Sequence, residues 1–253
     1  MQSRCTQLTL LLFVLISLVA CKKDHTPPAP PAPPVVKVKT IAAGTVLNTY
    51  FYDNKGRVAR IEFDGYGKTE YIYADTGIVV SFYDTTGAFK GKEVYKLGAN
   101  GLAVSSYNSN TTTDQYVYTY TSSGQLSTSS TIRTLAGPLI RRWDYSYYYT
   151  NNNLDSTLVS YTNGSSVTKS VYAYYDEYYT DKTNTTGNDN LGQAFRGASS
   201  KNPVKAARDI GMDSQGNMPQ TNYSYEYDVQ GNITKVLHVW GSSPFTPVIY
   251  TYY

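Results

Sequence analysis

The feature that most constrains the fold is a set of tyrosines at every second position, followed by a glycine turn. It is clearest near the C-terminus, where Tyr223, Tyr225 and Tyr227 alternate with polar residues. Side chains of a β-strand alternate between its two faces, so these three rings line one side of a strand. The Asp228 side chain can bond the backbone two residues on, and Gly231 supplies the positive φ of a bulged type I turn.

Residues 232–240 are rich in β-branched and aromatic side chains, which predicts the return strand of one β-hairpin. Degraded copies of this hairpin recur from residue 50 onward. The predicted repeat-turn residues are Asp53, Gly56, Gly77, Gly101, Gly124, Asp228 and Gly231. The four glycines from Gly56 to Gly124 are 21, 24 and 23 residues apart, the length of two strands and two turns. The pattern predicts an all-β fold, an extended antiparallel meander of repeated β-hairpins.

Residues 176–220 interrupt this rhythm before the last hairpin. Residues 181–190 are polar and rich in Gly, Asn and Thr, which indicates a loop. Short helical turns are expected only at residues 191–195 and 204–208. Such an irregular insertion is either a binding loop or a cap over one face of the sheet, and the cap is the favoured interpretation.

The chain has 27 tyrosines and 7 phenylalanines. Phenylalanine would serve if burial alone were needed, whereas the tyrosine hydroxyl requires water or a partner. This balance predicts that many rings lie on a half-exposed face of the sheet.

The N-terminal residues have a different character. Arg4 precedes a mostly apolar run at residues 8–19, which has the length of a signal-peptide core and is too short to span a membrane as a helix. The run ends in Leu-Val-Ala-Cys21, which resembles the lipobox of bacterial lipoproteins. That resemblance implies a signal peptide over residues 1–20, cleavage before Cys21 and acylation of this cysteine. An ordinary secretory signal with a chance cysteine is the alternative.

Residues 21–34 are expected to form a tether, since six of the 11 prolines of the chain lie within residues 25–34. A polyproline II segment of this length holds a domain roughly 25 Å from the membrane. Residues 35–253 then form a single all-β domain. The only cysteines are Cys5 and Cys21, so this domain has no thiol for a disulfide, a nucleophile or a zinc site.

Charge and motifs exclude several classes of function. The formal net charge is +3, and the chain has no long basic run, so nucleic-acid binding is not expected. Two histidines and the absence of Gly-x-Ser-x-Gly and Gly-Lys-Ser motifs give no catalytic triad and no phosphate loop. Carboxylates such as Glu62, Asp64 and Glu70 have no recognisable glycosidase or calcium spacing. We expect no enzyme activity, no cofactor and no metal.

The pattern Tyr-x-Tyr-Asp-x-x-Gly at residues 50–58 and 225–233 resembles the YD repeat of Rhs-type proteins. More broadly, residues 45–253 resemble uncharacterised Bacteroidota surface lipoproteins built from divergent hairpins of this kind. The resemblance implies an outer-membrane protein, anchored by lipid and facing the cell surface. The chain is too short to enclose a toxin as Rhs shells do, so that function is not carried over.

Two functions fit these observations. The first is a non-enzymatic structural or interaction module that meets another surface protein. The second is a glycan-binding module, in which an exposed row formed by Trp143, Tyr145, Tyr147 and Tyr149 stacks on sugar rings. A hydrolase would require three or more carboxylates in one pocket.

Overall fold

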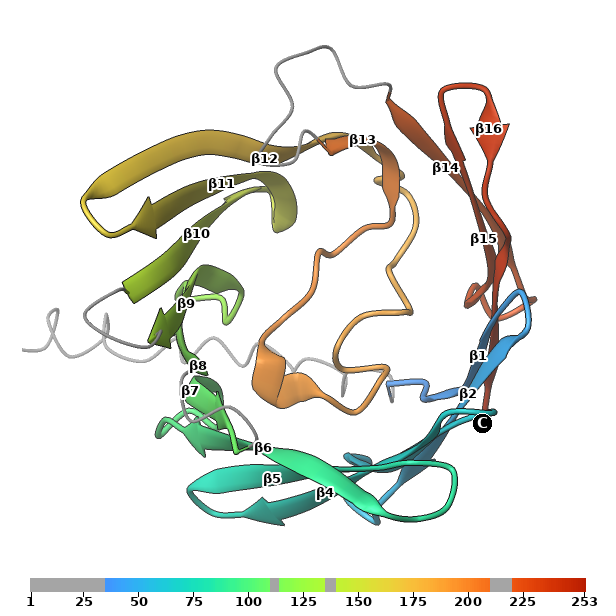
Figure 1. The fold of residues 1–253 in the computed structure, drawn as a ribbon. Coiled ribbons are helices and arrows are strands. Elements are labelled where there is room, and N and C mark those ends of the chain that lie inside the picture. The colour runs from blue at the N-terminus through green and yellow to red at the C-terminus, as the bar shows by residue number, and fades with distance from the viewer. Residues whose placement is uncertain (1–34, 110–113, 135–139, 210–219) are drawn as a thin grey trace, which may run out of the picture. The chain divides into compact units, whose positions relative to one another are not determined.

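The computed structural model describes residues 35–109, 114–134, 140–209 and 220–253, and Val35–Tyr253 form one compact unit (Figure 1). The expected signal peptide, Cys21 and the tether lie outside the described residues. Within the part of the chain that is described, no helix is long and apolar enough to cross a membrane.

Strands dominate the regular structure of the described residues. Their bounds are β1 (Val38–Ala43), β2 (Val46–Tyr52), β3 (Val58–Phe63), β4 (Gly67–Ala74), β5 (Gly77–Tyr83), β6 (Phe89–Leu97), β7 (Ala103–Asn108), β8 (Asp114–Tyr120), β9 (Leu126–Thr134), β10 (Ile140–Thr150), β11 (Asn153–Asn163), β12 (Ser166–Tyr178), β13 (Val204–Asp209), β14 (Thr221–Tyr227), β15 (Ile233–Trp240), β16 (Ser243–Pro244) and β17 (Val248–Tyr252). One 3-10 helix, η1 (Ala194–Arg196), lies between β12 and β13.

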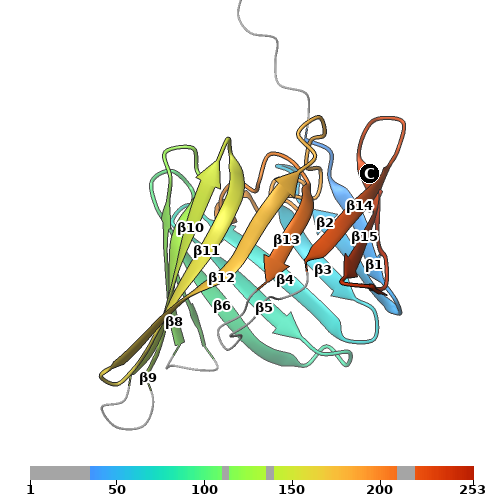
Figure 2. The same ribbon diagram turned by 90° about the horizontal axis from the view of Figure 1, so that it is seen from above.

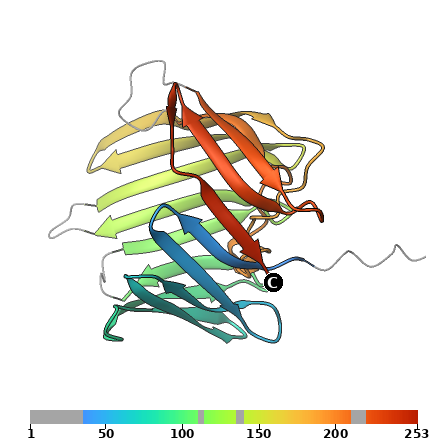
Figure 3. The ribbon, with the colours of Figure 1, turned by 90° about the vertical axis from the view of Figure 1, so that its right-hand side faces the viewer.

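The strands close into a barrel. Each strand from β1 to β15 pairs antiparallel with the next strand along the chain. β15 then pairs with β17 and β17 with β1, so sixteen strands form the ring, while β16 extends β15 as a short hairpin. Figure 3 shows the last strands beside the first, and Figure 2 shows strands that run obliquely, as closure of a sheet requires.

The all-β antiparallel prediction is confirmed, but the prediction of an open, extended meander was wrong. An open sheet leaves the outer edges of its first and last strands without backbone partners. Here Val38–Ala43 and Val248–Tyr252 pair at five register positions and remove both edges. Strand β1 therefore has a partner on each side.

Five of the hairpin turns share one hydrogen-bonding pattern. At the first, the Asp53 amide donates to the Arg57 carbonyl at 2.8 Å, and the Gly56 amide donates to the Asp53 carbonyl at 3.0 Å. Asp53 Oδ1 also accepts from the amides of Lys55 and Arg57, each at 2.9 Å. The backbone pattern recurs at residues 84–88, 98–102, 121–125 and 228–232. Each of these turns has a glycine with φ between 70° and 85°, which side-chain-bearing residues rarely adopt.

Gly77 has a different role from the other repeat-turn residues. It begins β5, and a Cβ atom on it would lie 2.7 Å from the Tyr95 carbonyl oxygen. The constraint there is close approach of two backbones rather than a left-handed turn. At the β10–β11 turn Asn151 and Asn152 adopt φ of 52° and 65°, the region that asparagine tolerates best after glycine.

Residues 179–203, the connection from β12 to β13, run through the inside of the ring, and we call this segment the plug (Figure 1). Phe195 of the plug packs with Ile78, Val80 and Tyr95, and Leu191 packs against a second cluster around Val38, Tyr50, Val58 and Ile61. The insertion thus covers the inner face of the sheet. Its predicted helical turn at 191–195 overlaps η1, whereas residues 204–208 form part of strand β13 instead of a helix.

Candidate functional site

Pairs of tyrosines spaced by two residues line the inside of the barrel. Three tyrosines form hydrogen bonds with the plug: Tyr52 with Asn190, Tyr71 with Gln193, and Tyr95 with Arg196. Because side chains alternate along a strand, the residues two positions away also face inward. The inward pairs are Tyr50 and Tyr52, Tyr71 and Tyr73, Tyr118 and Tyr120, Tyr147 and Tyr149, Tyr225 and Tyr227, and Tyr250 and Tyr252. The repeated tyrosines therefore face the plug rather than the surroundings.

Several tyrosine hydroxyls donate to backbone carbonyls of the adjacent strand. Tyr52 donates to the Val38 carbonyl at 2.6 Å, Tyr73 to Val58 at 2.9 Å, and Tyr252 to Ile233 at 2.7 Å. Each acceptor stands at a register shift of its strand, where a β-bulge interrupts the ladder of backbone hydrogen bonds. At these three positions phenylalanine would not serve, since the tyrosine hydroxyl supplies a donor at an interrupted ladder.

Burial raises the pKa of these inward phenols. It raises the pKa of Tyr50, Tyr120 and Tyr252 to about 12, with neighbouring tyrosines adding to the shift. These inward phenols therefore stay neutral throughout the physiological range.

The plug is fixed to the wall next to the hairpin turns. The carbonyl of Asn190 accepts a hydrogen bond from the Val38 amide at 3.1 Å, and the carbonyl of Gly192 accepts one from the Val58 amide at 3.0 Å. Further along, the Ala198 amide donates to the Gly124 carbonyl at 2.9 Å. Phe195 meets the Tyr95 ring edge-on with centroids 5.1 Å apart. The plug is thus part of the packed interior, not a loose loop.

The aromatic row predicted to bind sugars lies on the inner face of β10. Tyr147 shares a hydrogen bond of 3.0 Å with Ser129. Ser129 lies directly opposite Tyr118 on the neighbouring strand, so its side chain faces inward as that of Tyr118 does. Trp143 lies 5.0 Å from Tyr161, and Tyr145 lies 5.8 Å from Tyr172, measured between ring centroids. All four side chains of the row, including Tyr149, are half-buried. The expectation that this row is exposed on a sheet face was wrong, because the barrel closes with that face inside.

Carboxylates gather at the groove that is described below, where three of them form part of the lining, and others stand in separate ion pairs. Asp176 pairs with Arg208 at 2.6 Å and Glu177 with Lys205 at 2.7 Å. The described residues contain no group of three or more His, Cys, Asp or Glu side chains that could hold a metal ion.

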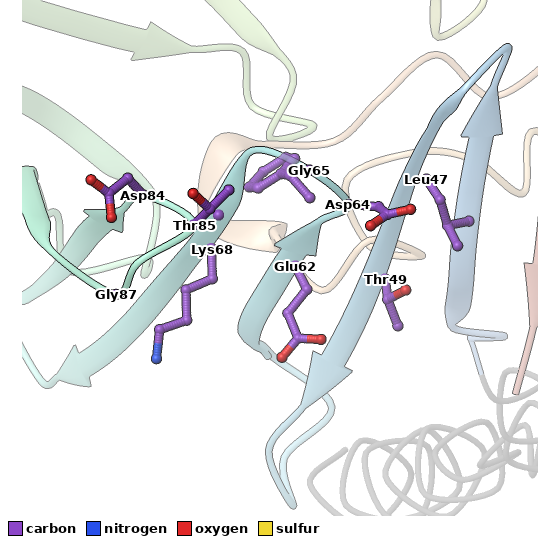
Figure 4. Close-up of a pocket in the computed structure, with 11 residues that line it drawn as sticks. Leu47, Thr49, Glu62, Asp64, Gly65, Lys68, Asp84, Thr85 and Gly87 are labelled. Atoms are coloured by element: carbon purple, nitrogen blue, oxygen red, sulfur yellow. The ribbon is translucent and has the colours of Figure 1, made fainter.

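The outer surface has a groove of about 550 Å³ at one end of β2–β4 (Figure 4). We call it the outer groove. Its lining residues are Leu47, Thr49, Glu62, Phe63, Asp64, Gly65, Gly67, Lys68, Asp84, Thr85 and Gly87. Thr49, Glu62 and Lys68 are direct neighbours across three strands, and the β3–β4 and β5–β6 turns complete the groove. Sequence reasoning noted Glu62 and Asp64 as carboxylates but missed the groove, because its walls come from separate hairpins.

Gly67 allows the two turns to approach each other. Its φ is +115°, and a Cβ atom there would lie 2.1 Å from the Tyr83 carbonyl oxygen and 2.8 Å from the Asp84 Cα. Only glycine fits this position. A Cβ atom on Gly65 or on Gly87 would meet nothing within 4 Å.

Comparison with known proteins identifies a fold. No family model matches the sequence, and no curated protein matches it. A porin-like protein from Bacteroides uniformis matches with a TM-score of 0.60 and 14% identity over 87% of this chain and 99% of that chain. A second, from Bacteroides vulgatus, matches with a TM-score of 0.50 and 11% identity over 86% and 99%. At these identities the likeness defines the class of fold, a closed antiparallel β-barrel.

Proposed function

We propose that this protein is a non-enzymatic lipoprotein of the outer membrane, displayed at the cell surface, whose barrel stands in water as a structural or interaction module. The Cys21 lipid supplies the membrane attachment, and the barrel does not span the bilayer. The Bacteroides barrels support an envelope setting through their shared fold.

The observation that carries this proposal is the charge on the outer wall. Arg60 pairs with Glu62 at 3.0 Å, and Lys235 of β15 pairs with Glu226 of β14 at 2.7 Å. These residues alternate with inward-facing ones such as Ile61, so they face outward. A membrane-spanning barrel presents an apolar band to lipid, where each Arg or Lys at the midplane costs about 2–4 kcal/mol.

Two more ion pairs extend this surface around the ring. Lys68 pairs with Glu70 at 2.6 Å on β4, and Arg142 pairs with Asp144 at 2.7 Å on β10. Charged pairs therefore stand on the outer faces of β3, β4, β10, β14 and β15. The inside is also unlike an open channel, because the plug and the tyrosine pairs pack against each other.

Replacing the anchor tests the proposal. We expect Cys21→Ser to move the full chain from the membrane fraction to the soluble fraction, with its β-sheet circular dichroism unchanged. Wild type should resist extraction with alkaline carbonate, because several acyl chains on one cysteine anchor durably. A conservative Cys5→Ser change serves as the matched control and should remain in the membrane. Retention of Cys21→Ser after carbonate extraction would contradict the proposal and indicate that the barrel itself inserts.

A further inference from the structure

We propose that the outer groove binds a neutral saccharide. This inference rests on the proposed function of a surface-displayed interaction module and gives that module a ligand class. It places the site on the outer wall, between the β3–β4 and β5–β6 turns, rather than on the Trp143 row inside the barrel.

The first argument concerns hydrogen bonding. Asp84 is engaged by Lys90 at 2.8 Å, and Glu62 is engaged by Arg60 at 3.0 Å. Among the described residues, the side chains of Thr49, Asp64 and Thr85 make no hydrogen bond or ion pair with protein. Two hydroxyls and one carboxylate therefore line the same groove with their bonding capacity free. Such groups match the hydroxyls of a sugar, which both donate and accept.

The second argument concerns aromatic exposure. Two exposed rings stand at the rim without lining the groove: Tyr66, between Gly65 and Gly67, is 70% exposed, and Phe89, two residues after Gly87, is 55% exposed and meets the Tyr83 ring edge-on. Leu47, 39% exposed, adds an apolar wall. Single exposed rings are common on protein surfaces, so what matters is their position at the two turns, where an oligosaccharide that extends beyond the groove would meet them.

The third argument is charge. Three charged residues of the groove are paired: Glu62 with Arg60, Lys68 with Glu70, and Asp84 with Lys90. The Asp64 carboxylate is left as the uncompensated charge of the groove. An anionic ligand, such as a sialylated, sulfated or phosphorylated glycan, would meet repulsion there. A neutral sugar accommodates the carboxylate by donating hydroxyl hydrogen bonds to it.

The test uses the full-length lipoprotein in detergent on an array of neutral and anionic oligosaccharides. We expect retention on neutral members only. Asp64→Leu and Tyr66→Ala should each weaken that binding about tenfold or more, since each removes a charged hydrogen bond or a stacking surface. The control is Asp75→Leu, which changes an exposed turn aspartate between β4 and β5, outside the groove.

The outcomes separate this inference from the proposed function. Absence of binding to every neutral member would overturn the inference, as would equal binding of anionic members or unchanged binding by both groove variants. Retention of a lysine-rich peptide in place of sugars would overturn it too. If Cys21→Ser is released from the membrane while no sugar binds, the groove inference fails and the tethered module stands. If sugar binds while the Cys21→Ser protein stays in the membrane, the groove inference stands and the lipid-tethered module fails.

Discussion

Raising the pH from 10 to above 12 is expected to unfold the barrel in one cooperative step. A tyrosine in an unfolded chain has a pKa near 10. Burial raises the pKa of Tyr50, Tyr120, Tyr149, Tyr178 and Tyr252 to about 12. The folded state thus favours the neutral phenols. Their contribution to stability is complete below pH 10 and is lost as the pH rises through 12.

Phenolate absorbance and far-ultraviolet circular dichroism, followed together, measure this transition. The buried phenols should ionise at the pH where the sheet signal disappears. Tyr50→Phe is an informative variant, because the Tyr50 hydroxyl has no hydrogen-bond partner among the described residues. It removes one ionisable group without removing a bond, so the midpoint should move to higher pH. Ionisation of all tyrosines near pH 10 with an intact sheet signal would contradict the buried arrangement.

Gly192→Ala is expected to lower the free energy of unfolding by about 2–5 kcal/mol, through strain and overpacking. Gly192 lies in the plug with φ of +68°. A Cβ atom there would stand 2.6 Å from the Val58 amide nitrogen and 2.7 Å from the Tyr52 ring. The plug would have to move away from the wall at the point where Gly192 accepts the Val58 hydrogen bond.

Gly164→Ala is the matched control for this prediction. Gly164 has a similar φ, +59°, in the β11–β12 turn, but a Cβ atom there meets nothing within 4 Å. It should cost only the conformational penalty of about 1–2 kcal/mol. Urea denaturation measures both losses. Equal losses for the two variants would show that the plug does not press against Tyr52.

The sequence was sufficient to predict strands and turns because their signals are local. Tyrosine alternation gives a period of two, and Asp53 to Arg57 contains all the groups that its turn requires. Closure has no such local signal. It depends on Val38–Ala43 meeting Val248–Tyr252 at the far end of the chain, and on strand twist summed around the ring.

The direction in which the tyrosines face was equally undetermined. Alternation assigns Tyr71 and Tyr73 to one face of a strand but does not say whether that face is inside, and tyrosine suits either. The structure places them inside, where bulges leave carbonyls such as that of Val58 for the hydroxyls to bond. The outer groove was hidden for another reason, since Thr49, Lys68 and Thr85 come together only when separate hairpins are registered side by side.

Cysteine labelling tests the orientation of the wall most directly. Ile72 is 65% exposed on the outer face of β4, and Val80 is 2% exposed on the inner face of β5. In isolated membranes, a charged, membrane-impermeant maleimide should modify Ile72→Cys rapidly and leave Val80→Cys unmodified until the protein is denatured. Protection of Ile72→Cys that is lifted only when detergent removes the lipid would show that the outer wall lies in the bilayer, and would contradict a barrel held in water by a lipid anchor.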